Sequence, residues 1–185
     1  MAVDGSMFTQ MRITLDVSRK LDSARIPYML TGSMALSFYT QPRMTRDLDF
    51  VVDFEPGDEI GIARLFGGEY QVDEEPARKA IMARSMFNII HKETLFKVDF
   101  IVRKKTQFEH FEFARRKRME LDKVPTWVIS KEDLIISKLN WAKDSLSDYQ
   151  LRDVKNLLAT GCDMDYVKKW VTSLNLEAPF NKARK

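Results

Sequence analysis

The chain has 185 residues, 44% of them hydrophobic and 31% charged, which fits one medium-sized globular domain or a core with a small helical appendage. Its formal net charge of +3 is too small to indicate nucleic-acid binding, and no apolar run approaches the roughly 20 residues that a membrane helix needs. The single cysteine, Cys162, excludes an internal disulfide and argues against a cysteine zinc cluster, and with an N-terminus that lacks a signal pattern it predicts a cytoplasmic location without membrane association.

Apolar residues in the first half of the chain recur at helical spacing in some segments and at strand spacing in others. The first helix is expected to end before Pro27 and the second before Pro42, because proline disfavours a helical residue in front of it. In chain order we predict a helix, a strand, a short helix, a second strand and two helices, over residues 7–25, 28–30, 33–39, 47–53, 58–66 and 76–84.

The second half shows two hairpin patterns and then changes to helical spacing. Ser130 and Asp133 are spaced like a capping box, although glutamate or glutamine is the usual partner of the serine. Gly161 is expected to end one helix, and Asp163 is placed to cap the next. In chain order we predict an antiparallel hairpin, a helix, a short hairpin and three helices, over residues 86–90 with 95–102, 106–118, 119–129, 130–146, 147–160 and 163–174.

Strands mixed with helices, followed by helices alone, predict an α+β sheet domain with a helical C-terminal part. We place the boundary where the pattern changes, which gives a core over residues 1–129 and a helical subdomain over residues 130–185 packed on it. No linker rich in proline, glycine or serine marks this boundary, so it rests on the change in pattern alone.

Two carboxylates alternate along one predicted strand, so Asp47 and Asp49 point to the same face. Neighbours such as Leu48 make the strand look buried, and a buried carboxylate is costly unless a partner such as a metal ion neutralises it. Asp99 stands in the same way within the apolar strand of residues 97–102. If the two strands are neighbours, three carboxylates converge and can hold two divalent ions that clamp the oxygens of a phosphoryl displacement.

Gly32 and Ser33 lie between a strand and a helix, the position in which a chain can cradle a phosphate. Glycine lets the backbone approach a ligand closely, the helix presents free amide groups, and the serine adds a hydroxyl donor. Arg43 and Arg46, in the loop before Asp47, are placed to counter further phosphate charge. Taken alone, Gly32-Ser33 is explained by an ordinary glycine turn, and the aspartates are explained by a strand edge in water. The glycine–serine turn followed in order by the three aspartates favours a nucleoside triphosphate site.

In order and spacing, residues 28–102 resemble the core of the nucleotidyltransferase (DNA polymerase beta-like) superfamily. Its pattern is an apolar strand, Gly-Gly or Gly-Ser, a short spacer, Asp-x-Asp or Asp-x-Glu, and a third aspartate on a later strand. The residues on those positions are Gly32, Ser33, Asp47, Asp49 and Asp99. The resemblance implies a small mixed sheet flanked by helices, and transfer of a nucleoside monophosphate from a nucleoside triphosphate that depends on Mg²⁺ or Mn²⁺.

Residues 130–158 are similar to the AbiEii-like branch of that superfamily and to related small nucleotidyltransferase-like proteins. That branch carries a DLI-x-x-KL helix, matched by Lys138, and then an RD helix, matched by Arg152 and Asp153. A second aspartate often follows that pair, but this sequence has Asn156 there. Because the branch includes toxins of type IV toxin–antitoxin systems, the resemblance implies a cognate antitoxin as partner and an acceptor hydroxyl on RNA (such as tRNA), a protein or a small molecule.

Lys138 also stands out by its position within an apolar helical stripe that includes Leu134, Ile135 and Leu139. Such a lysine either extends past the stripe to water or reaches a phosphate or carboxylate in a cleft. Asp153 is then either its partner or a base that orients the incoming hydroxyl. The candidate catalytic residues are Asp47, Asp49, Asp99 and Lys138, of which the three aspartates are also the candidate metal ligands. The candidate residues for binding the nucleotide are Gly32, Ser33 and Arg46.

A basic stretch keeps a second interpretation open, a catalytically silent module of this fold that binds RNA or a protein. Its basic residues are Arg103, Lys104, Lys105, Arg115, Arg116, Lys117 and Arg118. Glutamates are interleaved with them, and such a stretch is more often a solvated face. The two histidines lack further ligands at zinc spacing, and Ser33 lacks a histidine–aspartate pair nearby, so we expect neither a zinc site nor a hydrolase triad.

Overall fold

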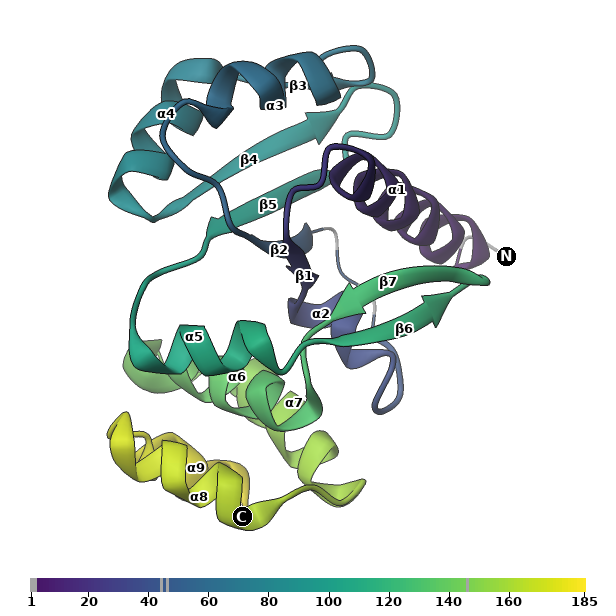
Figure 1. Cartoon of the computed structure of the whole chain (residues 1–185). Helices are drawn as coiled ribbons and strands as arrows, with labels where there is room; N and C mark the ends of the chain where they lie inside the picture. Colours follow the sequence, from purple (N-terminus) through teal and green to yellow (C-terminus); the bar gives the residue numbers. More distant parts are fainter. Residues whose placement is uncertain (1–2, 44, 46, 146) are drawn as a thin grey trace.

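The computed structural model describes residues 3–43, 45, 47–145 and 147–185 (Figure 1). Its strands form one mixed sheet in the order β3-β4-β5-β2-β1-β7-β6. The strands are β1 (Tyr28–Leu30), β2 (Asp47–Val52), β3 (Tyr70–Gln71), β4 (Met86–His91), β5 (Lys97–Val102), β6 (Lys117–Leu121) and β7 (Val124–Val128). Strand β2 is antiparallel to β1 and parallel to β5, which places two strands from distant parts of the sequence side by side at the centre of the sheet.

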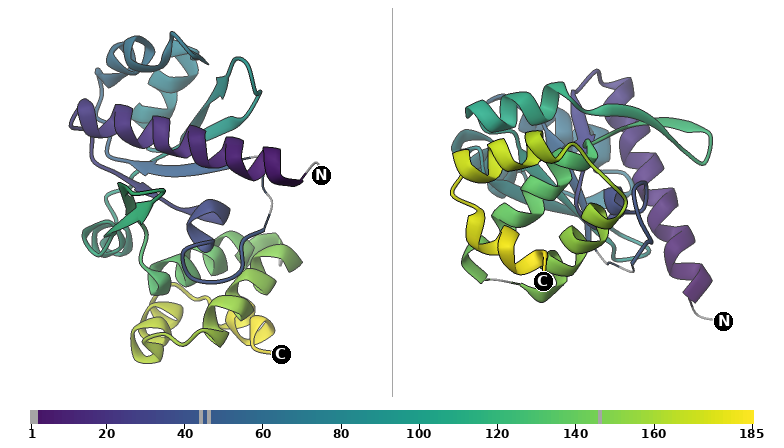
Figure 2. Two further views of the ribbon diagram at one scale, coloured as in Figure 1. Left: turned by 90° about the vertical axis from the view of Figure 1, so that its right-hand side faces the viewer. Right: turned by 90° about the horizontal axis from the view of Figure 1, so that it is seen from below.

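The helices divide between the sheet and the C-terminal part of the chain. They are α1 (Val3–Ser23), α2 (Gly32–Leu36), α3 (Asp58–Phe66), α4 (Glu74–Ala83), α5 (Gln107–Ala114), α6 (Lys131–Ser145), α7 (Asp148–Ala159), α8 (Met164–Ser173) and α9 (Glu177–Ala183). Figure 2 shows α1 running across the sheet, with the C-terminal helices, coloured green to yellow, grouped together away from it. No helix among the described residues is both long and apolar enough to cross a membrane.

The main core forms on one face of β2 and β5, and its composition follows from strand alternation. The apolar side chains on that face are Leu48, Phe50, Val52, Val98, Phe100 and Val102, all fully buried. The ring of Phe100 lies 5.4–6.3 Å, centroid to centroid, from the rings of Phe50, Phe54, Phe66 and Phe87. Because these positions point to the core, the alternate positions of the same strands point to the opposite face.

The structure confirms the predicted α+β class, the mixed sheet flanked by helices and the helical C-terminal part. The hairpin of β4 and β5 is antiparallel as predicted. At the start of α6 the backbone N–H of Asp133 donates to the hydroxyl of Ser130, as in a capping box, whereas the Asp133 carboxylate accepts from the Ser130 hydroxyl in place of the Ser130 backbone N–H. The division into a core of residues 1–129 and a subdomain of residues 130–185 stays a prediction.

The helix predicted over residues 106–118 is too long, because α5 ends at Ala114 and β6 begins at Lys117. Strand β6 pairs with β7, and Arg116 and Arg118 place their guanidinium groups 4.7 and 5.2 Å from the ring of Trp127. These contacts across the hairpin favour an extended chain over helix.

Two elements were not predicted from the sequence. Strand β3 is too short to show a periodic pattern. Helix α9 contains Pro179, which is typical of a helix end but here lies in the first turn, where a missing backbone N–H costs nothing.

Candidate active site

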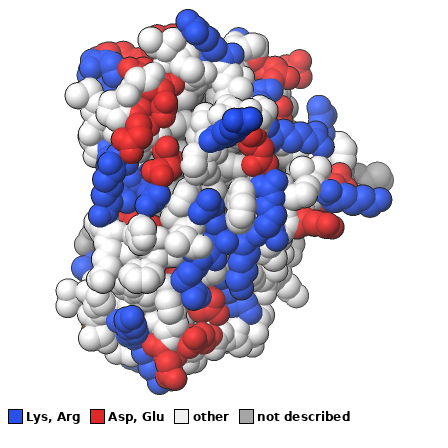
Figure 3. All heavy atoms as spheres, viewed as in Figure 1, with Lys and Arg blue, Asp and Glu red and all other residues white. Residues whose placement is uncertain are grey.

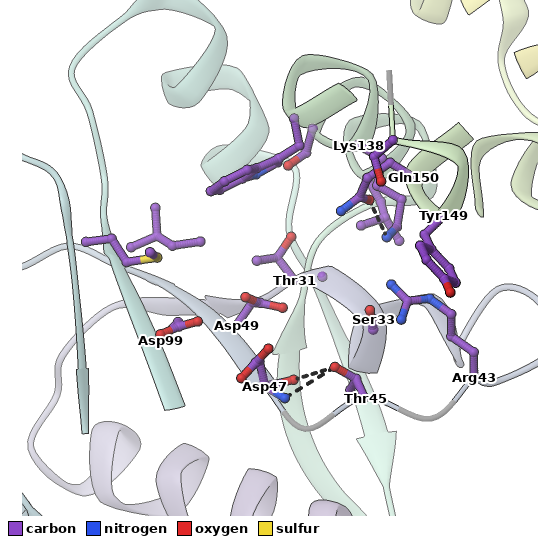
Figure 4. A pocket seen from close by; sticks show the side chains of 17 residues that line it. Thr31, Ser33, Arg43, Thr45, Asp47, Asp49, Asp99, Lys138, Tyr149 and Gln150 are labelled. Atoms are coloured by element: carbon purple, nitrogen blue, oxygen red, sulfur yellow. Dashed lines mark hydrogen bonds between the residues drawn. The ribbon is translucent and has the colours of Figure 1, made fainter. Parts of the chain in front are cut away.

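A cavity of about 430 Å³ opens between the carboxylate face of the sheet and the helices α2, α6 and α7. The candidate residues that line it are Gly32, Ser33, Asp47, Asp49, Asp99 and Lys138. Figure 4 shows the three aspartates on one side of the cavity, and Arg43, Lys138, Tyr149 and Gln150 on the other. The structure therefore brings together all the candidate residues that it describes, while Arg46 lies outside the described residues.

The register of β2 and β5 determines where the carboxylates meet. The two strands pair in parallel with Asp49 directly opposite Asp99 and Asp47 directly opposite Lys97. The backbone carbonyl of Asp49 also accepts a hydrogen bond of 2.9 Å from the backbone N–H of Thr31, which ties β2 to the turn that begins α2. The aspartates and the glycine–serine turn thus share one rigid frame.

Gly32 is required by the close approach of Asp49. Its φ angle is +63°, in the left-handed region, and an ideal Cβ built on it would lie 1.9 Å from Oδ2 of Asp49. The carboxylate of Asp49 therefore fills the space that any side chain at position 32 would need. Ser33, the next residue, is buried and lines the same cavity.

The carboxylates carry more negative charge than their surroundings neutralise. Burial raises the pKa of Asp49 to about 6, with further contributions from the charges of Asp99 and Asp47, and Lys138 and Lys97 offset this only in part. Burial also raises the pKa of Asp99. In addition, Oδ1 of Asp99 is buried without a hydrogen-bond partner among the described residues, so this site has unused capacity to bind a cation.

Lys97 provides the nearest positive charge to this cluster. Its Nζ lies 3.0 Å from Oδ2 of Asp99 and 3.6 Å from Oδ1 of Asp47. In the described part of the chain, no three histidine, cysteine, aspartate or glutamate side chains stand together as a ready metal site. The donors nevertheless fit Mg²⁺ or Mn²⁺ in kind, because hard cations prefer carboxylate oxygens, and the side chain of Asp47 is 52% exposed, so an ion can reach it.

A buried ion cluster forms the opposite wall. Lys138 donates to Oδ2 of Asp153 at 2.7 Å and to Gln150 at 3.1 Å, and Nε of Arg43 donates to both oxygens of Asp153 at 3.0 and 3.2 Å. Asp153 is almost fully buried and does not line the cavity, so it is the partner of Lys138 and Arg43 and does not face a substrate. Burial lowers the pKa of Lys138, and the contact with Asp153 opposes that shift.

Three lining or neighbouring residues were missed in the sequence, although local spacing could have indicated two of them. Lys97 precedes Asp99 by two positions and therefore shares its strand face. Trp141 is 58% exposed and lines the cavity, three residues after Lys138 on the same helix face. Tyr149 also lines the cavity, at the beginning of α7, where no pattern marked it.

Comparison with known proteins shows the fold. Neither a scan against protein-family models nor a search of curated proteins finds a match. Among solved structures, the antibiotic-resistance factor ANT(2'')-Ia aligns over 96% of this chain and 97% of its own, with 12% identity and a TM-score of 0.59. An antigenic nucleotidyltransferase-like protein from Paracoccidioides brasiliensis aligns over 94% and 90%, with 13% identity and a TM-score of 0.59. The lincosamide antibiotic adenylyltransferase LnuA, bound to lincomycin, aligns over 84% and 96%, with 15% identity and a TM-score of 0.53. The chain therefore has the fold of these nucleotidyltransferases.

We expect Gly32→Ala to destabilise the protein through its collision with Asp49. Left-handed strain alone costs about 1–2 kcal/mol, and the collision raises the loss in free energy of unfolding above about 3 kcal/mol. Gly161→Ala is the matched control, because its φ is +75° and its Cβ would meet open space. Urea unfolding should show a smaller loss of stability from Gly32→Ala in the Asp49→Ala background than in the wild-type background, because the colliding carboxylate is then absent. Equal losses in both backgrounds would contradict the steric explanation.

The raised pKa of Asp49 predicts that stability falls as the pH rises from about 4 to about 6. Between its ordinary value of 3.8 and the folded value of about 6, Asp49 binds more protons in the folded state than in the unfolded state. Asp49→Asn should therefore gain up to about 3 kcal/mol relative to wild type above pH 6 and little below pH 4. Urea unfolding in the presence of a chelator, at several pH values, measures the difference. If the difference in unfolding free energy between Asp49→Asn and wild type stayed constant from about pH 4 to about pH 6, the raised pKa of Asp49 would be ruled out.

We expect Asp153→Asn to cost about 3 kcal/mol of folding free energy, because it leaves Lys138 charged and buried without a counter-ion. Asp148→Asn serves as control, since Asp148 is exposed and its 3.5 Å pair with Lys182 lies at the surface. Thermal and urea unfolding of both variants measure the effect. Similar stability of the two variants would show that the buried cluster does not hold the wall in place.

Proposed function

We propose that this protein is an enzyme that transfers a nucleoside monophosphate from a nucleoside triphosphate to a hydroxyl group of an acceptor. The observation that supports this most strongly is the in-register placement of Asp49 and Asp99 beside Gly32 and Ser33, in one cavity of a nucleotidyltransferase fold. The cavity volume of about 430 Å³ is within the range of small-ligand sites.

Each group in the cavity takes a role in this proposal. Asp47 and Asp49, with Asp99, would hold Mg²⁺ or Mn²⁺, which when bound supplies neutralising charge to the phosphates. The Gly32 backbone and the Ser33 hydroxyl hold the β- and γ-phosphates. Lys138 adds positive charge from the opposite wall, where Asp153, which also binds Arg43, keeps it in place.

The reaction is a displacement at the α-phosphorus. The acceptor oxygen forms a bond to this phosphorus, the bond to the bridging oxygen of the β-phosphate breaks, and pyrophosphate leaves with that electron pair. The proton of the acceptor hydroxyl passes to Asp99, which burial makes a better base than an aspartate in water.

The acceptor is the finer part of the proposal. RNA such as tRNA, a protein and a small molecule are the three classes that we consider. The fold is shared with an antibiotic adenylyltransferase that binds lincomycin, and the cavity wall includes the apolar side chains of Met86, Ile101 and Trp141, so we propose a small hydroxylated molecule. A role in a toxin–antitoxin pair rests on the resemblance of residues 130–158 alone.

The alternative of a silent RNA- or protein-binding module depends on the basic stretch over residues 103–118. Figure 3 shows basic side chains across the middle of one face with acidic side chains among them. Arg103, Arg115 and Arg118 form ion pairs with Asp53, Asp133 and Asp22, respectively. Their charge is largely taken up within the protein, which weakens the case for a phosphate-binding surface.

Calorimetry with a triphosphate and Mn²⁺, followed by labelled-triphosphate transfer to RNA, protein and small-molecule pools, tests the proposal. We expect Asp47→Ala/Asp49→Ala to lose metal-dependent binding and to lower transfer at least about 100-fold. Glu93→Ala/Glu120→Ala removes the same charge at exposed positions and should behave like wild type. Equal binding by wild type and the Asp47/Asp49 variant would count against the mechanism. No transfer, together with salt-sensitive RNA binding, would favour the silent module.

A further inference from the structure

Lys97 occupies a distinctive place in the cluster of carboxylates. It is the first residue of β5, two positions before Asp99, and it pairs in register with Asp47 on β2. Strand alternation therefore puts its side chain on the carboxylate face of the sheet. The ammonium group contacts Asp99 at 3.0 Å and Asp47 at 3.6 Å, so it lies where a cation shared by these two carboxylates would lie.

The ammonium group of Lys97 does not form an ion pair with the third carboxylate, that of Asp49. Asp49 forms no ion pair with any described residue, and it lies directly across from Asp99, which Lys97 already binds. Oδ1 of Asp99 also lacks a partner among the described residues. A single ammonium thus neutralises part of a three-carboxylate cluster, and a divalent ion that bound all three would have to take over its contacts.

The side chain of Lys97 can give up its position. It is 38% exposed and lies at the end of its strand, so its long flexible stem can turn towards water without disturbing the core. Asp47, the other partner, is half exposed as well. The pair with Asp47 lies at the surface, where such pairs are worth little, whereas Asp99 is buried and needs a cation in place of the ammonium once Lys97 turns away.

We propose that Lys97 is a built-in counter-cation that holds Asp47 and Asp99 in the nucleotide-free protein and competes with divalent metal for them. This inference rests on the proposed function, because it concerns the same metal site. It follows that metal alone binds weakly, whereas metal that arrives with a triphosphate displaces the ammonium. Metal and nucleotide therefore strengthen each other's binding.

The test is titration of the full-length protein with Mn²⁺ in the absence of nucleotide, with free Mn²⁺ measured by electron paramagnetic resonance. We expect Lys97→Met to bind Mn²⁺ about tenfold more tightly than wild type, because one nearby positive charge is removed. Lys97→Gln, which keeps a polar side chain, should show the same gain. Lys97→Arg keeps the charge and should stay as weak as wild type. Lys105→Met, which removes a lysine remote from the cavity, controls for net charge.

The outcomes separate this inference from the proposed function. A gain in Lys97→Met and Lys97→Gln, absent from Lys97→Arg and Lys105→Met, supports competition. Equal Mn²⁺ affinity of wild type and Lys97→Met, including no binding by either, overturns it. A repeat with a non-hydrolysable triphosphate tests the proposed function separately. If wild type and Lys97→Met bind Mn²⁺ equally but both bind the nucleotide only with metal, the proposed function stands and the role of Lys97 does not.

Discussion

The parallel, in-register pairing of β2 and β5 is the constraint on which the rest of the structure depends. The same strands that bury Phe50 and Phe100 on one face place Asp49 opposite Asp99 on the other. Raising the pKa of Asp49 from 3.8 to about 6 corresponds to about 3 kcal/mol when it is ionised. Complete burial of one phenylalanine contributes about the same amount, and Phe100 packs within a cluster of five aromatic rings. The aromatic core can therefore hold carboxylates together that would otherwise repel each other.

The cavity joins two walls of opposite charge. Carboxylates from β2 and β5 form one, while the other contains Lys138 on α6 and Arg43 from the loop before β2, both held by Asp153 on α7. The carboxylate wall alone suits a cation, and the wall with Lys138 and Arg43 alone suits an anion. A ligand that combines phosphate groups with a metal ion matches both at once, and this complementarity, more than any single residue, is what connects the geometry to nucleotide chemistry. The buried cluster around Asp153 also couples the C-terminal helices to the loop that leads into the site.

Local patterns predicted much of the fold and the site, and long-range contacts explain what they missed. Alternation alone placed Asp47 and Asp49 on one face, because the direction of side chains along a strand is a local property. The register that sets Asp49 against Asp99 joins distant segments, so spacing could only suggest it. Arg43 and Asp153 are 110 positions apart in the sequence, and no local pattern connects them. The end of α5 was misplaced for the same reason, since Trp127 on the facing strand decides it.

The lysine at position 97 has a consequence for how this chain reaches its folded state. A cation tethered to the same strand has an effective concentration set by the length of its side chain, whatever ions the surrounding medium contains. A diffusible ion would be present only in proportion to its supply, and a protein that needed one to fold would stay unfolded when it was scarce. With an ammonium group of its own between two of its acidic side chains, the sheet can assemble without waiting for an ion from solution.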